Sequence, residues 1–259
     1  MSDWASGPPP AHPLRVRPRP VPEPFDYESV PAGYYDEVFR RARGIQSKWH
    51  HLKFERIARE LEGCRRVLDV GCGPGTLAGN FGVDHDWVGT DLSARQIGYA
   101  RRTHGHRGVR FYTASPADVL FEHGPFDAVT MVELIEHLDP PLVDETLGDA
   151  LGCLRPGGRL ILSTPNFRSA WPLVEAAVNR FGDLSYDSQH INRFDAERLV
   201  ELLARHGLEQ PRAEPYLCLA PFAAALGWRL ADGVARLERG AVEKRLGLLL
   251  IGTAVKPEG

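Results

Sequence analysis

The fold of this chain is encoded in Val67-Leu68-Asp69-Val70-Gly71-Cys72-Gly73-Pro74-Gly75-Thr76-Leu77-Ala78, with Val88-Gly89-Thr90-Asp91 following shortly after. The apolar, β-branched beginning is typical of a strand that is buried on both faces of a parallel sheet. Three glycines then permit a sharp turn close to a ligand, and the next helix begins with unpaired N–H groups. Asp91 ends a second strand about twenty residues later, where a carboxylate can accept both hydroxyls of a ribose. The pattern therefore predicts a site for a nucleoside cofactor.

The glycine motif fits two kinds of nucleoside cofactor. The segment Gly73-Pro74-Gly75-Thr76-Leu77-Ala78 matches the dinucleotide pattern G-x-G-x-x-A, which would indicate an NAD-dependent oxidoreductase. This alignment places Asp69 and Gly71 inside the preceding strand, where a dinucleotide fingerprint is normally apolar. The alternative alignment, Asp69-x-Gly71-x-Gly73-x-Gly75, resembles the first motif of class I S-adenosylmethionine-dependent methyltransferases. In that family the acid and the glycine backbone hold the methionine end of the cofactor.

The resemblance to class I methyltransferases covers most of the chain, from about Pro31 to Lys256. It includes Asp91, the expected strand Phe126–Thr130, and Leu154–Leu162, which looks like the family's fifth strand with the turn before it. The resemblance implies an α/β fold with a Rossmann-like seven-stranded mostly parallel sheet and helices on both faces. The spacing of apolar residues adds an N-terminal helical cap and a helical insertion before the last strand. The strands are expected near residues 66–70, 86–91, 109–113, 126–131, 158–164, 212–219 and 247–255.

The same resemblance implies which residues contact S-adenosylmethionine. Many relatives bind the adenine amino group with an acid near Ser115, so Ser115 and Asp118 are the candidates to replace it here. The backbone of Val132 is expected to border the cofactor, and Lys53 or Arg56 to approach its carboxylate. The complete expected set comprises Lys53, Asp69, Gly71, Cys72, Gly73, Gly75, Asp91, Leu92, Ser115 and Val132.

A second group of chemically active residues follows the strand expected at 126–131, in Val132-Glu133-Leu134-Ile135-Glu136-His137-Leu138. In a helical turn Glu133, Glu136 and His137 lie on one face, because residues three and four apart are neighbours. Two carboxylates and an imidazole at the carboxyl end of a parallel strand indicate a metal site or an acid-base cluster. The simpler alternative is a solvated helix face on which the charges have no joint role.

This segment resembles the Glu-x-x-Glu-His motif of the ubiquinone-biosynthesis O-methyltransferases, where the motif binds a divalent cation. It is also similar to the motif of the small-RNA 2′-O-methyltransferases, which add a histidine from a later loop, and His190 stands at the corresponding place. The resemblance implies a divalent metal (Mg²⁺, Mn²⁺, Zn²⁺ or Fe²⁺) held by Glu133, Glu136, His137 and His190. Without a metal, His137 or His190 is the candidate catalytic base.

Composition limits the class of protein. The chain has 259 residues, a formal net charge of −3 and no basic block, so it lacks the electrostatic signature of a dedicated nucleic-acid binder. Its four cysteines are scattered, which favours reduced thiols and a cytoplasmic location. No apolar run is long enough for a membrane span, so we expect at most peripheral contact with a membrane.

Three segments are expected along the chain. Residues 1–26 are rich in proline and are expected to form a disordered arm, residues 27–62 the helical cap, and residues 63–259 the methyltransferase domain. The insertion 221–245 carries apolar residues at helical spacing between arginines and lysines, which predicts a basic amphipathic helix. Such a helix packs onto its own protein, covers a dimer contact or the acceptor site, or lies on a membrane surface.

The leading hypothesis is a methyltransferase that moves a methyl group from S-adenosylmethionine to an oxygen of a small or lipid-linked acceptor, assisted by the metal. An RNA 3′-terminal 2′-O-methyltransferase is the closest competing function, which His190 favours and the absence of a basic block disfavours. An NAD-dependent oxidoreductase and a binding protein without catalytic activity also remain compatible with the sequence. The acceptor pocket would be walled by an apolar segment that contains Phe167, Trp171, Leu173, Val174, Phe181 and Tyr186.

Overall fold

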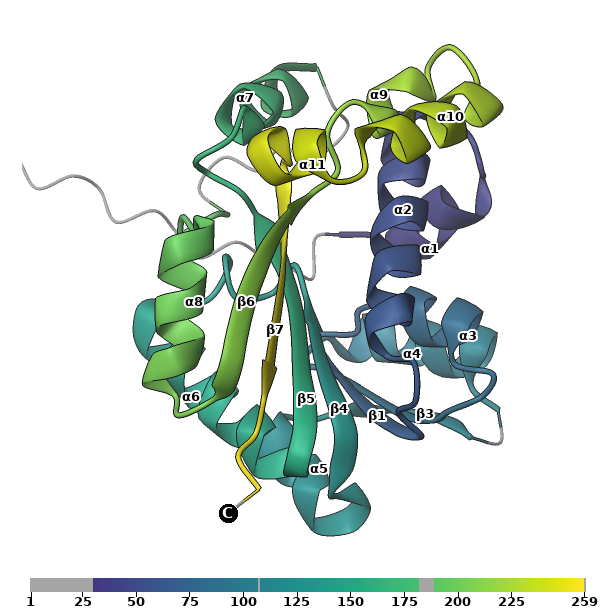
Figure 1. Ribbon diagram of the computed structural model, residues 1–259. Helices are drawn as coiled ribbons and strands as arrows, with labels where there is room; N and C mark the ends of the chain where they lie inside the picture. Colours follow the sequence, from purple (N-terminus) through teal and green to yellow (C-terminus); the bar gives the residue numbers. More distant parts are fainter. Residues whose placement is uncertain (1–29, 107, 182–188, 259) are drawn as a thin grey trace, which may run out of the picture.

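Seven strands form one sheet in the order β3-β2-β1-β4-β5-β7-β6 (Figure 1). The structure is a computed structural model that describes residues 30–106, 108–181 and 189–258, so the predicted arm 1–26 lies outside the described residues. Six strands point in one direction, and β7 is antiparallel to its neighbours β5 and β6, which confirms the predicted mostly parallel sheet. The strands are β1 (Arg66–Val70), β2 (Asp86–Asp91), β3 (Val109–Thr113), β4 (Phe126–Val132), β5 (Leu154–Pro165), β6 (Glu209–Tyr216) and β7 (Leu249–Val255).

The largest differences from the predicted strand boundaries are in β5 and β6, and two of them have local backbone causes. β5 begins at Leu154, which pairs with Phe126 of β4 before the register shifts, so the expected turn at Gly157 lies within the strand as an irregularity. β6 ends at Tyr216 rather than continuing to residue 219, because Leu217 adopts a left-handed backbone with a φ of 57°.

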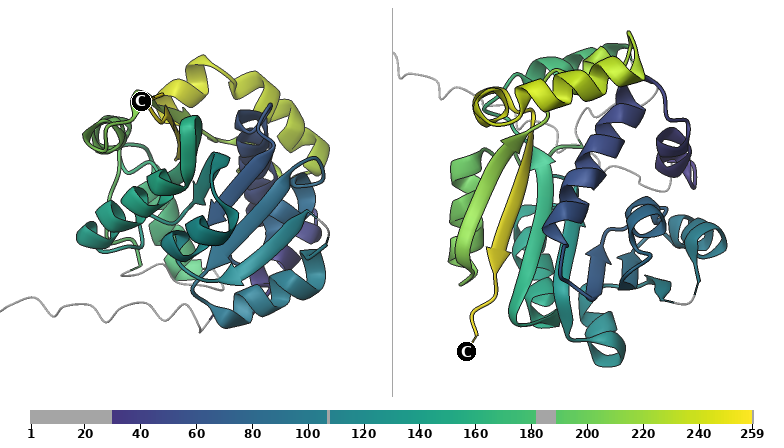
Figure 2. Two further views of the ribbon diagram at one scale, coloured as in Figure 1. Left: turned by 90° about the horizontal axis from the view of Figure 1, so that it is seen from below. Right: turned by 45° about the vertical axis from the view of Figure 1, so that its right-hand side comes forward.

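Helices cover both faces of the sheet, because successive side chains of each strand point to opposite sides. Val67 packs into the cluster on the side of α2 (Gly44–Glu60), α3 (Thr76–Phe81) and α4 (Ala94–His104). Leu68 packs on the other side, with α5 (Pro116–His123), α6 (Pro140–Cys153) and α8 (Ala196–Arg205). Figure 2 shows the sheet between these two layers. The carboxyl ends of β1, β4 and β5 share one edge of the sheet, and α7 (Trp171–Phe181) follows β5 there.

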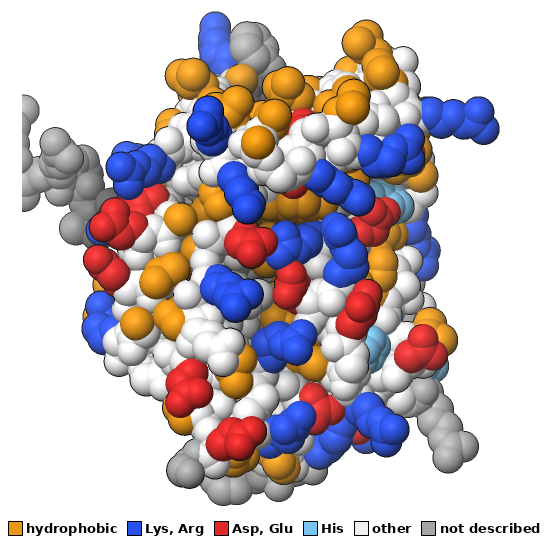
Figure 3. Space-filling model, in the orientation of Figure 1, with side chains coloured by type: hydrophobic (Ala, Val, Ile, Leu, Met, Phe, Trp, Pro, Cys, Tyr) orange, Lys and Arg blue, Asp and Glu red, His pale blue; other side chains and the backbone are white. Residues whose placement is uncertain are grey.

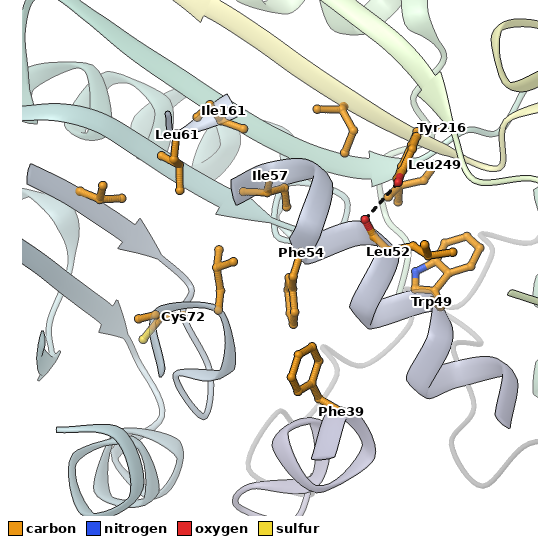
Figure 4. Close-up of a cluster of buried hydrophobic side chains, with 14 of the residues drawn as sticks. Phe39, Trp49, Leu52, Phe54, Ile57, Leu61, Cys72, Ile161, Tyr216 and Leu249 are labelled. Atoms are coloured by element: carbon orange, nitrogen blue, oxygen red, sulfur yellow. Dashed lines mark hydrogen bonds between the residues drawn. The ribbon is translucent and has the colours of Figure 1, made fainter. Parts of the chain in front are cut away.

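The N-terminal cap consists of α1 (Tyr34–Arg40) and α2, which packs against the sheet (Figure 4). Phe39 and Phe54 contact each other with ring centroids 5.8 Å apart, and Ile57 is fully buried. The hydroxyl of Tyr216 in β6 donates a hydrogen bond of 3.1 Å to the carbonyl of Leu52. The cap is therefore continuous with the hydrophobic core of the domain.

A buried carboxylate fastens α1 to α4. Asp36 is fully buried and accepts a hydrogen bond of 2.9 Å from the Tyr99 hydroxyl, while His104 Nε2 lies 2.9 Å away and Arg40 Nε 3.1 Å away. Burial opposes ionisation of this carboxyl, but the hydrogen bonds from His104 and Tyr99 outweigh it and lower the pKa of Asp36. An ionised Asp36 therefore holds the cap in place at neutral pH.

The insertion before β7 is helical, as predicted, but it forms three short helices: α9 (Ala220–Ala223), α10 (Trp228–Glu238) and α11 (Ala241–Leu246). Gly240, with a φ of 92°, separates the last two, since such a conformation interrupts a helix. α10 packs onto the cap helix α2. The Trp228 ring contacts His51 edge to face at 5.2 Å and lies 4.4 Å from the Lys48 ammonium, which also pairs with Asp232. One side of the insertion is thus used for packing within the protein.

The opposite side of the insertion exposes apolar side chains, which gather at the top of Figure 3 with lysine and arginine around them. Leu226 and Leu237 are each 84% exposed. Among the described residues, no helix is long and apolar enough to cross a membrane. We call this surface the apolar crown, and it comprises the exposed apolar residues of the insertion and its two ends: Leu219, Leu226, Leu230, Leu237, Val242 and Leu246.

Candidate active site

The glycine turn after β1 has the backbone that its sequence predicts. Gly71 and Gly75 have φ values of 71° and 76°, a left-handed conformation that side-chain-bearing residues rarely adopt. A Cβ at Gly75 would lie only 2.6 Å from the Phe111 ring, so this position also lacks space. Gly73 N–H donates to Asp91 Oδ2 at 2.9 Å, which ties the turn to the end of β2. The predicted acid and the predicted turn are therefore brought together.

Asp69 is buried at the end of β1. Its side chain accepts a hydrogen bond of 2.6 Å from the Thr130 hydroxyl of β4. Burial raises the pKa of Asp69 to about 7, although the Thr130 hydrogen bond opposes the shift and the nearby Asp91 charge adds to it. Burial likewise raises the pKa of the neighbouring Cys72 thiol well above its usual value, which disfavours the thiolate that a nucleophile needs.

A cavity of about 1200 Å³ lies at the carboxyl edge of the sheet, where ligands bind in open α/β sheets. This is larger than the roughly 300–1,000 Å³ of a typical ligand pocket, so it has room for two molecules. Within the complete expected set, Gly75 is the one residue that does not line it. The others do, and they are Lys53, Asp69, Gly71, Cys72, Gly73, Asp91, Leu92, Ser115 and Val132.

Three of the candidate cofactor contacts, Ser115, Asp118 and Arg56, are also bonded to other residues of the protein. Asp118 accepts hydrogen bonds from the Ser115 N–H at 3.0 Å and the Ser115 hydroxyl at 2.7 Å, and together they cap α5. Only Ser115 lines the cavity, so it is the better placed of the two candidates for the adenine. Arg56 pairs with Glu60 and with Glu214, and it does not line the cavity.

The predicted helical turn after β4 is wrong, since residues 133–138 form an irregular turn. Glu133 has a φ of 50°, and its N–H donates to the Ser163 carbonyl of β5 at 2.9 Å. Its carboxylate pairs with the buried Lys53 ammonium of α2. Although burial opposes it, this ion pair lowers the pKa of Glu133. Glu133 is therefore neutralised by Lys53, whose ammonium was expected to meet the cofactor.

The turn instead brings Glu136 and His137 to His190. One potential ligand atom from each of these residues lies within 4.8 Å of the other two, whereas Glu133 is not part of this group. Glu136 is fully buried, and burial together with the Glu133 charge raises its pKa well above the usual value. Burial and the nearby His190 lower the pKa of His137 to about 4, so its ring is neutral at physiological pH. Three of the four predicted metal residues thus converge.

A short loop holds this cluster together. The backbone N–H groups of Ile191 and Asn192 donate to the Glu136 carbonyl at 2.8 and 3.0 Å. The Asn192 side chain donates to the carbonyls of Ile135 and Leu138 at 3.0 and 2.6 Å. Asn192 was not predicted as a site residue, because nothing in its local sequence shows that it faces a turn more than fifty residues earlier.

Aromatic residues form the wall of the cavity opposite the cofactor turn. Trp49 of α2 and Trp171 of α7 have ring centroids 5.4 Å apart, and both line the cavity. His50 lines it too, and burial lowers the pKa of this ring to about 3. Phe167, predicted to line the acceptor pocket, instead contacts the His190 ring edge to face at 5.8 Å. Leu173 and Val174 of the same predicted wall do line the cavity. The Phe181 side chain and Tyr186 lie outside the described part of the chain. His51, next to His50 in sequence, stacks on Phe39.

The fold, the glycine turn and the acid at the end of β2 define a class I S-adenosylmethionine-dependent methyltransferase. Residues 40–210 match a family model described as a methyltransferase domain, and the chain belongs to that family. This membership favours S-adenosylmethionine over a dinucleotide.

Curated relatives are similar over part of their length. The ubiquinone biosynthesis O-methyltransferase of Aromatoleum aromaticum is 37% identical over 106 residues, which are 39% of this chain and 44% of that protein. The protein of the same name from Sinorhizobium medicae is 38% identical over 124 residues, 46% of this chain and 49% of that protein. The chain therefore spans about half the length of the curated relatives it matches.

Solved structures share the fold at low identity. A methyltransferase from Thermotoga maritima, titled a possible histamine N-methyltransferase, aligns with a TM-score of 0.61 at 20% identity, covering 86% of this chain and 94% of that one. The magnesium protoporphyrin IX methyltransferase of Synechocystis PCC 6803, solved with bound SAH, aligns with a TM-score of 0.55 at 16% identity, covering 85% and 94%. At such low identities the similarity to these structures supports the fold alone.

Proposed function

We propose that this protein transfers the methyl group of S-adenosylmethionine to an oxygen of a small or lipid-linked acceptor, with a divalent metal at the acceptor side of the cavity. The observation that carries the proposal is the convergence of Glu136, His137 and His190 in the cavity that the cofactor turn also lines. Methyl transfer is an in-line displacement on a sulfonium, so donor and acceptor must lie in one space.

The donor set fits a divalent cation. Neither carboxyl oxygen of the buried Glu136 has a well-formed hydrogen bond to any described residue. A buried carboxyl whose hydrogen bonds are this poor is costly, and a cation held between it and two imidazoles would compensate for that cost. Glu136, His137 and His190 would hold the ion. When bound, a divalent cation favours loss of the acceptor hydroxyl proton at neutral pH.

The protein's own residues would bind and align the two substrates. The carboxylate of Asp69 is suited to the methionine ammonium, and Asp91 to the ribose hydroxyls. Leu92 is 79% exposed and lines the cavity, so it offers an apolar face for the adenine ring. Trp49 and Trp171 would pack against the acceptor and exclude water from it.

The acceptor class is supported by the relatives and by the cavity wall. The two curated relatives are named ubiquinone biosynthesis O-methyltransferases, and the wall near His190 is aromatic and apolar. Both features favour an aromatic hydroxyl on an apolar carrier. A short RNA is the alternative acceptor that the position of His190 in the cluster favours.

A lipid-linked acceptor would require approach to a membrane, and the apolar crown offers a surface for it. Its exposed leucines are interspersed with exposed basic residues of the insertion, including Arg236 and Arg239, as expected for contact with anionic lipid. Flotation with anionic vesicles tests this part, since a chain that stays in the dense fraction at low salt would contradict membrane contact.

Methyl-transfer assays with and without metal test the main proposal. Wild-type protein, stripped with chelator and then reloaded with Mg²⁺, Mn²⁺, Zn²⁺ or Fe²⁺, is incubated with S-adenosylmethionine and phenols, quinone precursors, glycolipids or short RNAs. We expect mass spectrometry to detect one added methyl group in a phenolic product and to lose that product after stripping. Full activity after exhaustive metal removal would contradict metal assistance, and methylation of RNA alone would favour the RNA acceptor.

A further inference from the structure

Both histidines of the cluster, His137 and His190, have a hydrogen-bond partner at the same ring nitrogen, Nδ1. His137 Nδ1 lies 3.0 Å from the backbone carbonyl oxygen of Gln189. His190 Nδ1 pairs with the carboxylate of Glu175, which extends from the middle of α7. Two unrelated segments therefore supply an acceptor to Nδ1 of each histidine.

The identity of these partners determines the form of the rings. A carbonyl oxygen and a carboxylate can only accept hydrogen bonds, so Nδ1 of each ring carries the proton. In a neutral imidazole this leaves the lone pair on Nε2, the nitrogen that would then face a metal ion. A histidine ligand whose other nitrogen donates to a carboxylate is held in orientation and is made more basic as a ligand.

Glu175 is well placed to act in this way. The side chains of His190 and Glu175 are only 6% and 15% exposed, so water competes weakly for their hydrogen bond. The Phe167 and Trp171 rings pack against the His190 ring with centroid distances of 5.8 and 6.2 Å, which restricts its rotation. Glu175 is not itself among the three residues that converge.

We propose that Glu175 is a positioning residue that fixes the tautomer and orientation of His190, so that Nε2 faces Glu136 and His137. The proposal rests on the metal site of the proposed function. It gives α7 a role beyond lining the cavity, because its Glu175 side chain links the aromatic wall to the cluster.

Titration of the full chain with Co²⁺ tests the effect on the metal site, with the visible absorption bands as readout. We expect Glu175→Leu to bind Co²⁺ about 10–100-fold more weakly than wild type and to show altered bands. Glu175→Gln keeps an accepting oxygen and should lie between the two. Glu197→Gln is the matched control, because Glu197 is 72% exposed and pairs only loosely with Arg168 at 3.5 Å. Equal affinities and bands in wild type, Glu175→Gln and Glu175→Leu would overturn the proposal.

Nitrogen-15 NMR of the metal-free protein supplies a second readout that a merely structural role would not move. The His190 signals, assigned by their loss in His190→Gln, should show a proton on Nδ1 in wild type and a shift toward Nε2–H in Glu175→Leu. An unchanged tautomer would overturn the proposal. If wild type binds no Co²⁺, the metal part of the proposed function fails, and the NMR result alone decides the role of Glu175. If Glu175→Leu does not fold, Glu175→Gln decides through the same two readouts.

Discussion

We predict that Asp69 makes cofactor binding depend on pH. Its carboxyl has a pKa of about 7 in the ligand-free protein because it is buried beside Thr130. In the proposed function the methionine ammonium lies against this carboxylate and stabilises its charged form, so we expect binding to require an ionised Asp69. At about pH 6, one unit below that pKa, roughly nine in ten molecules must first lose the proton, which costs about 1.4 kcal/mol, or tenfold in affinity. Above about pH 7.5 this cost nearly vanishes.

Isothermal titration with S-adenosylhomocysteine between about pH 6 and 8 measures this effect. We expect affinity to rise about tenfold over that range and to level off above the pKa. Repeating the titration at low pH in buffers of different ionisation enthalpy should show close to one proton released for each ligand bound.

Two variants distinguish Asp69 from other titrating groups. Asp69→Asn should bind more weakly and lose the pH dependence. Thr130→Val removes a hydrogen bond that favours the charged form, so its affinity curve should shift to higher pH. An affinity that stays flat between about pH 6 and 8, with no proton release, would refute this account of Asp69.

Three further predictions concern the cap, the turn and the apolar crown. Asp36→Asn should lower the free energy of unfolding at neutral pH by about 3 kcal/mol in urea denaturation. Because the pKa of Asp36 is lowered in the folded protein, this loss of stability should shrink as the pH falls through that pKa. An equal loss at every pH would contradict an ionised Asp36 in the network. Gly75→Ala forces a Cβ to 2.6 Å from the Phe111 ring and should weaken S-adenosylhomocysteine binding at least tenfold, as measured by calorimetry. A variant that binds with wild-type affinity would contradict a role of this turn in binding the cofactor. Leu237→Glu should abolish vesicle flotation and leave the melting temperature unchanged, whereas undiminished flotation would exclude this part of the crown.

The sequence was sufficient for the sheet because local chemistry determines most of it. β1 and β2 are short apolar strands that end at the glycine turn and at Asp91, and their boundaries were predicted to the residue. Tertiary context determined what could not be predicted. The irregularity at Gly157 depends on which residue of β4 pairs with Leu154. The pattern of apolar residues in the sequence does not determine that pairing.

The site was predictable where the functional residues are neighbours in sequence. The spacing of Glu133, Glu136 and His137 indicated a cluster, but the helix that was assumed for it does not form. The left-handed backbone of Glu133 and its partner Lys53, 80 residues away, redirect that carboxylate to the ion pair. The Glu175–His190 pair is likewise a product of the fold, since no signal in α7 marks one glutamate as a partner of a histidine.

The central claim is that a metal and the methyl donor share one cavity, and one relaxation measurement tests it directly. The carbon-13 methyl resonance of bound S-adenosylmethionine is followed while Mn²⁺ is added to the wild-type protein. The account predicts strong paramagnetic broadening of this resonance at stoichiometric Mn²⁺, and loss of that broadening in Glu136→Gln, which removes a ligand. Stoichiometric Mn²⁺ binding to the wild type with an unbroadened methyl resonance would contradict it.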